Sequence, residues 1–220
     1  MDHGCFITLE GGEGAGKSTL ARSLAERLRM SDIPVDLTRE PGGSPKAEAI
    51  RETILSGRIK PHGPFVEALM FSAARIDHID RRIRPALARG EWVICDRFID
   101  STRAYQGALG HIDPALLGEL EQVTIAGLVP DLTLILDLDP KEGLARAARR
   151  RNPGEAKDRF EGENLTFHRK LRAAYLAIAE KEPERCAVLD ASLPPDKLAQ
   201  AAWEVLCERL PLNQDADETP

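Results

Sequence analysis

The segment Gly11 to Ser18, which reads GGEGAGKS, constrains this chain more than any other feature. It matches the pattern G-x-x-x-x-G-K-[ST] and follows an apolar run, residues 5–10. After it, Leu20, Leu24 and Leu28 recur at helical spacing. A glycine-rich turn between a strand and a helix can surround a phosphate with backbone N–H groups, and the helix N-terminus favours an anion. The pattern therefore predicts a phosphate-binding loop in an α/β fold.

Within this loop, the motif assigns different tasks to different residues. Lys17 is expected to reach the β- and γ-phosphates of ATP, and the Ser18 hydroxyl is expected to coordinate Mg²⁺. The residues predicted to contact ATP are Gly11, Gly12, Glu13, Gly14, Ala15, Gly16, Lys17, Ser18 and Thr19. The alternative is an ordinary glycine-rich turn with a solvated lysine, which the strand–loop–helix setting disfavours. The loop does not identify the phosphate acceptor, because motor, switch and kinase proteins share it.

The rest of the chain alternates between predicted strands and helices. Further apolar runs at 35–39, 92–96, 132–138 and 186–191 are predicted as buried parallel strands. A capping residue or glycine followed by proline predicts helix starts at Ser44-Pro45, Gly63-Pro64, Asp113-Pro114 and Asp139-Pro140, and helical patterns cover 165–182 and 195–209. The expected fold is a three-layer α/β/α P-loop NTPase with a five-stranded parallel sheet covered by helices on both faces.

Composition narrows the class of protein. The chain has 220 residues, of which 42% are hydrophobic and 30% charged, so we expect one domain over 1–210 and a disordered acidic tail at 211–220. A net charge of −6 argues against sequence-independent nucleic-acid binding. No apolar run approaches the roughly 20 residues that cross a bilayer, and no leader precedes the first strand, so no membrane partner and a cytoplasmic location are expected. The cysteines are expected to be free thiols.

Two residue pairs outside the loop could serve a phosphate acceptor. Asp96 and Arg97 follow an apolar run at the carboxyl end of a predicted strand, where open α/β sheets place ligands, and arginine suits phosphate. Phe71 and Arg75 lie four residues apart and share one helix face, on which a base could stack. The alternatives are structural: Phe71 is a core residue, and the charged residues are solvated.

Several segments together resemble the motif set of bacterial thymidylate kinases. They are Glu13 within the loop, 38–43 (TREPGG), 71–75 (FSAAR), 96–107 (DRFIDSTRAYQG) and 130–134 (PDLTL). The resemblance extends from Phe6 to about Ala191. It implies a kinase that transfers the γ-phosphate of ATP to dTMP to give dTDP, with Mg²⁺ as cofactor and a homodimer as the assembly.

The same resemblance implies roles for individual residues. Phe71 would stack on thymine and Arg75 would hydrogen-bond to it, while Arg97 would clamp the acceptor phosphate and Asp96 would lie near Mg²⁺. Asp137, which ends another strand, is the weaker metal candidate. The remaining substrate-binding residues implied are Glu13 near the sugar 3′-hydroxyl, Arg39 and Arg51 near the phosphate, and Thr102, Tyr105 and Gln106 around the base and sugar, with the Tyr105 ring crowding the ribose 2′ position.

An arginine-rich stretch is expected to form a lid over about 146–160. Arg146, Arg149 and Arg150 have the spacing of one helix face, and Arg151 precedes the break Asn152-Pro153-Gly154. Arginines can meet the charge on a transferred phosphoryl group. The alternative is a solvated helix end. Because the loop's variable positions hold no arginine, the chain resembles the type that delivers its catalytic arginine from the lid, with Arg149 and Arg151 as first choices beside Lys17, Asp96 and Arg97.

Transfer of a phosphoryl group to a phosphate monoester does not need a strong general base. The attacking phosphate monoester is largely dianionic at neutral pH, since its second pKa is about 6, so positioning and charge neutralisation suffice. His78 and His168 are accordingly expected on the surface of helices. The rival functions are a kinase for another nucleoside monophosphate or a deoxynucleoside, and a non-catalytic P-loop ATP-binding switch, which should lack a second anion clamp.

Overall fold

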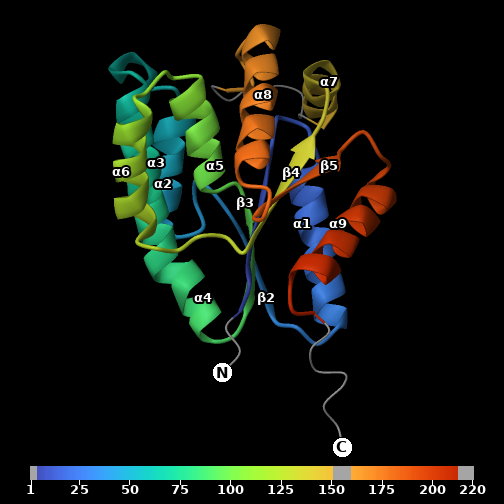
Figure 1. Cartoon of the computed structure of the whole chain (residues 1–220). Coiled ribbons are helices and arrows are strands. Elements are labelled where there is room, and N and C mark those ends of the chain that lie inside the picture. Colours follow the sequence, from blue (N-terminus) through green and yellow to red (C-terminus); the bar gives the residue numbers. More distant parts are fainter. Residues whose placement is uncertain (1–3, 151–159, 213–220) are drawn as a thin grey trace, which may run out of the picture.

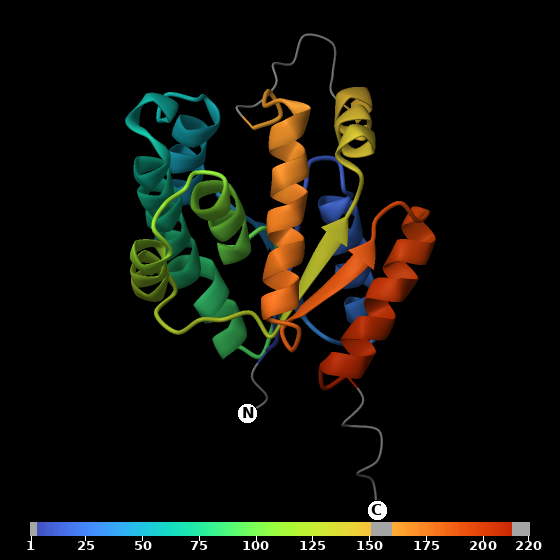
Figure 2. The same cartoon turned by 45° about the horizontal axis from the view of Figure 1, so that its top comes forward.

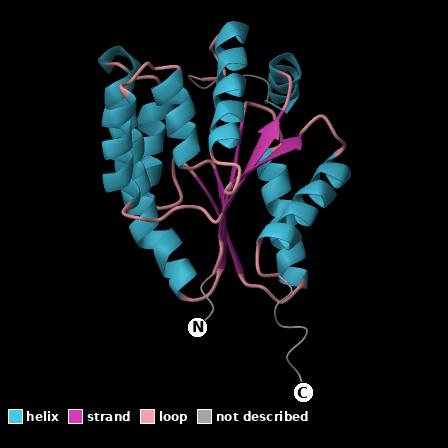
Figure 3. Cartoon of the chain, in the orientation of Figure 1, coloured by secondary structure: helices cyan, strands magenta, loops and turns pink. Residues whose placement is uncertain are grey.

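A parallel sheet forms the centre of the computed structural model, which describes residues 4–150 and 160–212. Its strands are β1 (Phe6–Gly11), β2 (Val35–Arg39), β3 (Trp92–Asp96), β4 (Leu132–Asp137) and β5 (Cys186–Asp190). They lie in the order β2-β3-β1-β4-β5, and every neighbouring pair is parallel. Figure 3 shows the strands between two groups of helices. All six residues of β1 are buried, as a strand covered on both faces requires.

Helices cover both faces of the sheet, so the predicted three-layer α/β/α fold is confirmed (Figure 1). One face packs against α1 (Lys17–Met30) and α9 (Pro195–Arg209). The helices described for the rest of the molecule are α2 (Pro45–Leu55), α3 (Pro64–His78), α4 (Arg84–Ala88), α5 (Ile99–Thr102), α6 (Pro114–Ile125), α7 (Pro140–Arg150) and α8 (Leu165–Lys181). Residues of α3, α4 and α8 pack on the opposite face from α1.

The helix starts follow from local chemistry. The side chain of Ser44 accepts a hydrogen bond from the N–H of Ala47, and Asp113 accepts from Ala115 and Leu116, with proline at the first helical position in both helices. The long helix from Pro64 changes to a π-helical turn at Ile79–Ile83 just before Pro85. Proline lacks the N–H that would continue the α-helical ladder, which accounts for an interruption of the regular helix at this point.

Strand order determines where ligands can bind. The chain leaves β1 for β2, crosses over to reach β3, and then returns past β1 to β4, so β1 lies at the point where the direction of winding changes. Leu9 pairs with Asp96, and Gly11 pairs with Leu136, which brings the carboxyl ends of β1, β3 and β4 to one edge. Such a switch point is the expected ligand site of an open α/β sheet.

The structure leaves some expectations untested. Residues 151–159, which include Arg151 and most of the predicted lid, lie outside the described residues, as do 213–220 of the predicted tail. The part of the predicted lid that is described is the arginine-bearing end of α7, beyond the carboxyl end of β4 (Figure 2). Over 4–150 and 160–212, no helix has both the length and the apolar composition that a bilayer crossing requires. The four cysteines are free, as expected.

Candidate active site

The phosphate loop joins β1 to α1 as predicted. Gly14 and Gly16 have φ angles of 68° and 95°, in the left-handed region that favours glycine. Gly14 also has a packing reason to lack a side chain, because a Cβ there would lie 2.0 Å from the carbonyl oxygen of Gly143 in α7. A Cβ on Gly143 would in turn lie 2.3 Å from the carbonyl oxygen of Glu13. The loop is therefore packed backbone to backbone against the first turns of α7.

Lys17 is buried at the mouth of this loop. Its Nζ donates to the carbonyl oxygens of Gly11 and Gly12 at 3.0 and 2.8 Å. Burial, together with the nearby cation of Arg97, lowers the pKa of Lys17. A buried ammonium group held by its own loop is available to exchange carbonyl oxygens for phosphate oxygens with little movement.

A cleft of about 330 Å³ brings the loop together with the predicted acceptor residues. Its lining includes Glu13, Gly14, Ala15, Gly16, Lys17, Ser18, Arg39, Arg51, Phe71, Arg75, Asp96, Arg97, Thr102, Tyr105, Gln106 and Arg150. Gly11 and Gly12 line a smaller adjoining pocket, and Thr19 is exposed in the first turn of α1. Arg149 is exposed near the end of α7. Residues from separate sequence motifs thus share one cavity.

Ser18 and Asp96 meet at the junction of α1 and β3. The Ser18 hydroxyl donates to Oδ2 of Asp96 at 2.5 Å, so two hard oxygen groups converge beside the loop. Among the described residues, no group of three or more His, Cys, Asp or Glu side chains could hold a metal ion. Asp137, the weaker metal candidate, holds Arg172 through both carboxylate oxygens at 2.5 and 2.8 Å. Ser18 and Asp96 are therefore the better-placed pair.

Arg97 is fixed from several directions. Its φ of 72° places a non-glycine residue in the left-handed region, a strained conformation that surrounding contacts must maintain. Its Nη2 donates to Oε1 of Glu13 at 2.7 Å, and its guanidinium lies 5.4 Å from the centroid of the Tyr105 ring. Burial alone would raise the pKa of Glu13. The positive charges of Arg97 and then Lys17 have the larger effect together, so the pKa of Glu13 is lowered. The predicted phosphate clamp is thus a partly buried cation paired with the carboxylate of Glu13.

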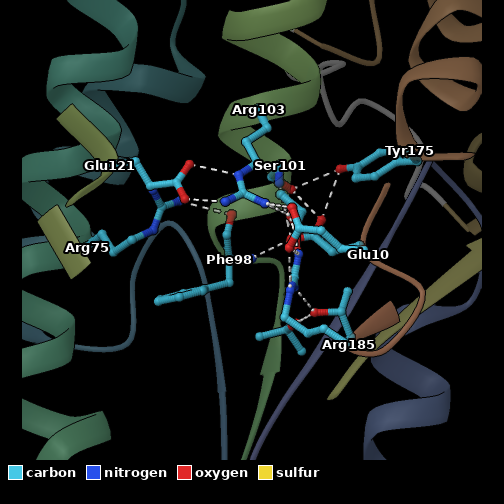
Figure 4. A network of polar contacts seen from close by, with 12 residues as sticks. Glu10, Arg75, Phe98, Ser101, Arg103, Glu121, Tyr175 and Arg185 are labelled. Atoms are coloured by element: carbon cyan, nitrogen blue, oxygen red, sulfur yellow. Dashed lines mark hydrogen bonds and ion pairs between the residues drawn. The ribbon is translucent and has the colours of Figure 1, made fainter. Parts of the chain in front are cut away.

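Behind Arg97 lies Glu10, a buried carboxyl group that the sequence analysis did not select. Its Oε1 accepts from the N–H groups of Phe98 and Ser101 at 2.7 and 3.2 Å, and Oε2 accepts from the Ser101 hydroxyl at 2.7 Å and that of Tyr175 at 3.0 Å (Figure 4). Burial and then the charge of Asp100 raise the pKa of Glu10 to about 7. The available signal was an acidic residue at the end of an otherwise apolar strand.

A second buried network surrounds Asp100. Both of its carboxylate oxygens accept from Arg185, at 2.8 and 2.9 Å, and Arg103 donates to Oδ1 at 3.1 Å. Arg103 also pairs with Glu121 of α6 (Figure 4). It pairs as well with Glu182 at the end of α8. These ion pairs join α5, α6, α8 and the start of β5, and they hold the helix that follows Arg97 against the sheet.

Arg75 lies at the other end of the cleft and is not a solvated surface residue. Its side chain is 3% exposed. Nε donates to Glu40 at 2.6 Å, Nη1 to the Thr102 hydroxyl at 3.1 Å and Nη2 to the carbonyl oxygen of Phe98 at 3.0 Å. The guanidinium plane is therefore set by the protein, and it lines the cavity that also contains Phe71.

The expectation that His78 and His168 lie on the surface is wrong, since they are 0% and 4% exposed. His78 follows Arg75 by three residues and shares its inward helix face. Its Nδ1 lies 3.0 Å from Oε1 of Glu40, and its Nε2 lies 2.7 Å from the Thr38 hydroxyl. The histidine therefore supports the carboxylate that orients Arg75, a role that only the tertiary structure reveals.

An aromatic group surrounds the remaining part of the cleft. Phe71 is half-buried, and its ring lies 6.3 Å from that of Phe160. The Tyr105 ring meets Phe160 edge-on at 5.0 Å. Thr102 and Gln106 are buried beside these rings. Phe160, which the sequence reading did not select, therefore adds a third ring to the predicted base pocket.

The cations at the rim are held more loosely. Arg39 pairs with Glu48 at 3.0 Å, with 54% of its side chain exposed, and Arg51 donates to the carbonyl oxygen of Pro41 at 2.7 Å. On α7, Arg146 bonds to Glu142 and to the carbonyl oxygen of Ala191. Arg146 is thus tied to the protein, whereas Arg150 of the same helix lines the cleft.

The chain is similar to known proteins over most of its length. A family model described as thymidylate kinase matches residues 9–202. A thymidylate kinase of Bradyrhizobium diazoefficiens is 55% identical over 207 residues, which cover 94% of this chain and 90% of that protein. A thymidylate kinase of Rhodopseudomonas palustris is 56% identical over 208 residues, with the same coverage. The crystal structure of thymidylate kinase from Ehrlichia chaffeensis superimposes with a TM-score of 0.74 at 32% identity, covering 93% of this chain and 99% of that one.

The buried pair between Glu40 and Arg75 predicts a large stability difference between two matched substitutions. Glu40→Gln leaves Arg75 without its anion in the interior and should lower the free energy of unfolding by about 3 kcal/mol. Glu48→Gln breaks the exposed pair with Arg39 and should cost less than about 1 kcal/mol. Urea unfolding followed by circular dichroism measures both. Equal losses would contradict the buried network.

The raised pKa of Glu10 predicts a pH-dependent effect of Glu10→Gln, which mimics the protonated carboxyl group. Below pH 4.5, the ordinary pKa of the side chain, Glu10 is protonated in both states of the protein. Between pH 4.5 and about 7 the unfolded chain ionises first, so the wild type loses stability relative to the variant as pH rises. Thermal unfolding from pH 4 to 9 should show this difference growing and then levelling. A pH-independent difference would argue against the shift.

Proposed function

The chain belongs to the thymidylate kinase family, and from this premise we propose that it transfers the γ-phosphate of ATP to dTMP to give dTDP. The observation that carries the proposal is the single cleft in which the phosphate loop, Arg97 and the pocket of Phe71 and Arg75 meet. A loop that binds a nucleoside triphosphate, a second anion clamp and a slot for a planar ring are the parts that a nucleoside monophosphate kinase requires. The reaction, with soluble nucleotides as substrates, would take place in the cytoplasm.

In this proposal, the protein acts chiefly by positioning and charge neutralisation. Lys17 would release the carbonyl oxygens of Gly11 and Gly12 for the β- and γ-phosphates, while Arg97 would hold the acceptor phosphate. Arg149 and Arg151 remain our first choices for the lid arginine that meets the transferred group. The acceptor oxygen needs no strong base, because its phosphate is largely dianionic at neutral pH.

Mg²⁺ fits the oxygen groups beside the loop. Ser18 and Asp96 would hold it, and such an ion usually keeps waters and takes substrate phosphates as its other ligands. When bound, it would neutralise charge on the β- and γ-phosphates. The protein's own contribution is to hold the Ser18 hydroxyl and the Asp96 carboxylate together at the end of β3.

Selection of thymine would depend on the buried end of the cleft. Arg75, held by Glu40, Thr102 and Phe98, presents a fixed guanidinium edge to a ring carbonyl, and Phe71 offers a face for stacking. Tyr105 and Gln106 would lie around the sugar, with Glu13 near the 3′-hydroxyl. A non-catalytic switch has no need of Arg97 and Arg75 in the same cavity as its loop, so this geometry favours an enzyme.

We also propose that two copies pair, as the family resemblance implies, and that they do so through the exposed apolar residues of α3 and α6. Phe65, Leu69 and Ile76 lie on one face of α3 and are 37%, 42% and 40% exposed. Leu116 and Val123, seven residues apart on the neighbouring α6, are 43% and 74% exposed. Adjacent apolar stripes of this kind are typical of an association surface.

The substrate assignment predicts a split between the Michaelis constants of Arg75→Lys. The lysine keeps a cation beside Glu40 but cannot reproduce the planar donor edge, so KM for dTMP should rise about tenfold while KM for ATP changes by less than about twofold. Arg81→Lys, on the exposed side of the same helical stretch, should match the wild type. ADP release with dTMP, dUMP, UMP, CMP and AMP completes the test, and no preference for dTMP would refute the assignment.

The pairing surface predicts a change in mass for Leu69→Glu. A carboxylate in the apolar stripe of α3 should convert a two-chain particle to a single chain in sedimentation velocity runs. Met30→Glu, at an 80% exposed position at the end of α1, should keep the wild-type mass. A wild type that sediments as one chain, or a Leu69→Glu variant that remains paired, would exclude this surface.

A further inference from the structure

Arg97 is held at its Nη1 end by two hydroxyl groups that have no assigned part in the reaction. Nη1 donates to the Ser101 hydroxyl at 3.2 Å and to the Tyr175 hydroxyl at 3.1 Å. Ser101 belongs to α5, whereas Tyr175 belongs to α8 and is 1% exposed. The two hydroxyl oxygens are 3.0 Å apart, so both can serve the same nitrogen. Segments far apart in the sequence therefore converge on one end of the guanidinium.

Glu10 determines to which group these two hydroxyls donate their protons. Its Oε2 lies 2.7 Å from the Ser101 hydroxyl and 3.0 Å from that of Tyr175. Each hydroxyl has a single proton, and Arg97 can only donate. The arrangement is satisfied when Arg97 donates to both hydroxyls and they donate to the carboxylate of Glu10. When Glu10 is ionised, opposite charges at the two ends make these hydrogen bonds charge-assisted.

The other end of Arg97 contacts a different kind of partner. Nη2 donates to Glu13, a residue of the phosphate loop whose side chain is 16% exposed and lines the cleft. Glu10, by contrast, is fully buried within the sheet. One end of the guanidinium is thus anchored from the protein interior, and the opposite end faces the cavity.

We propose that Glu10, Ser101 and Tyr175 are positioning residues that keep Nη1 of Arg97 fixed while Nη2 exchanges Glu13 for the phosphate of the acceptor. This inference rests on the proposed function, since it concerns the acceptor phosphate. In this proposal the three residues act through Arg97; Tyr175 and Glu10 are buried behind it, and Ser101 lies at the edge of the cleft. A clamp fixed at one end loses less side-chain freedom on binding, so removing a hydroxyl should weaken phosphate binding specifically.

Tyr175→Phe tests this inference, because it keeps the buried ring and removes only the hydroxyl. Isothermal titration calorimetry compares dTMP with thymidine, which has the same base and sugar but no phosphate. We expect the dissociation constant for dTMP to rise about tenfold, as for loss of a hydrogen bond to a charged group, and that for thymidine to change by less than about twofold. Ser101→Ala should show the same selectivity.

Thr8→Val is the matched control. It removes another buried hydroxyl, bonded to Thr133 at 2.7 Å, from the same strand as Glu10. We expect it to change melting temperature as Tyr175→Phe does, without changing dTMP binding. Equal weakening of dTMP and thymidine, or wild-type dTMP affinity in Tyr175→Phe, would overturn the inference. If the wild type does not bind dTMP, the proposed function is wrong, but the inference can still be tested. The same comparison is then made with the nucleoside monophosphate that the protein does bind and with the matching nucleoside.

Discussion

The carboxylate of Glu10 is the constraint on which the geometry of the site depends. Withdrawing a carboxylate from water costs several kcal/mol unless hydrogen bonds and charge replace the solvent. Here the replacements are the N–H groups of Phe98 and Ser101 and two hydroxyls that also contact Arg97. Glu10 precedes the phosphate loop, and Phe98 follows Arg97. The hydrogen bonds to this one buried carboxyl group therefore fix the separation between the phosphate loop and Arg97.

A similar arrangement holds the base end of the cleft. Glu40 bridges Arg75 and His78, while Asp100 bridges Arg103 and Arg185. Each of these two carboxylates has a guanidinium partner, so both ends of the ion pairs are oriented within the interior. Replacing one partner disturbs the other, which explains why such pairs specify geometry better than they add stability. In the proposed function, Arg97 would bind the phosphate of the acceptor and Arg75 would bind its base. The protein, and not the ligand, sets the orientation of both arginines.

The sequence predicted what depends on local chemistry. Ser44 and Asp113 cap their helices, as their position before proline indicates. The apolar runs form strands, because a parallel strand that is covered on both faces needs apolar side chains on both. The sequence did not predict hydrogen bonds between side chains that are far apart along the chain. His78 and Tyr175 look like ordinary helix residues, yet they bond to Glu40 and Glu10, 38 and 165 positions away. Periodicity indicates which face of a helix is buried, but not what a polar group on that face will meet.

Backbone contact between the loop and α7 extends these constraints to the arginines at the end of α7. Gly14 and Gly143 approach so closely that neither can carry a Cβ without displacing a carbonyl oxygen. The first turns of α7 therefore keep a fixed relation to the phosphate loop. Arg149 and Arg150 lie one to two turns further along that helix, and Arg150 already lines the cleft. Because a helix rises about 1.5 Å per residue, the reach of these arginines is set chiefly by where α7 docks. The phosphate loop has no arginine at its variable positions. The close contact of Gly14 with Gly143 nevertheless brings α7, and with it Arg150, close to the loop.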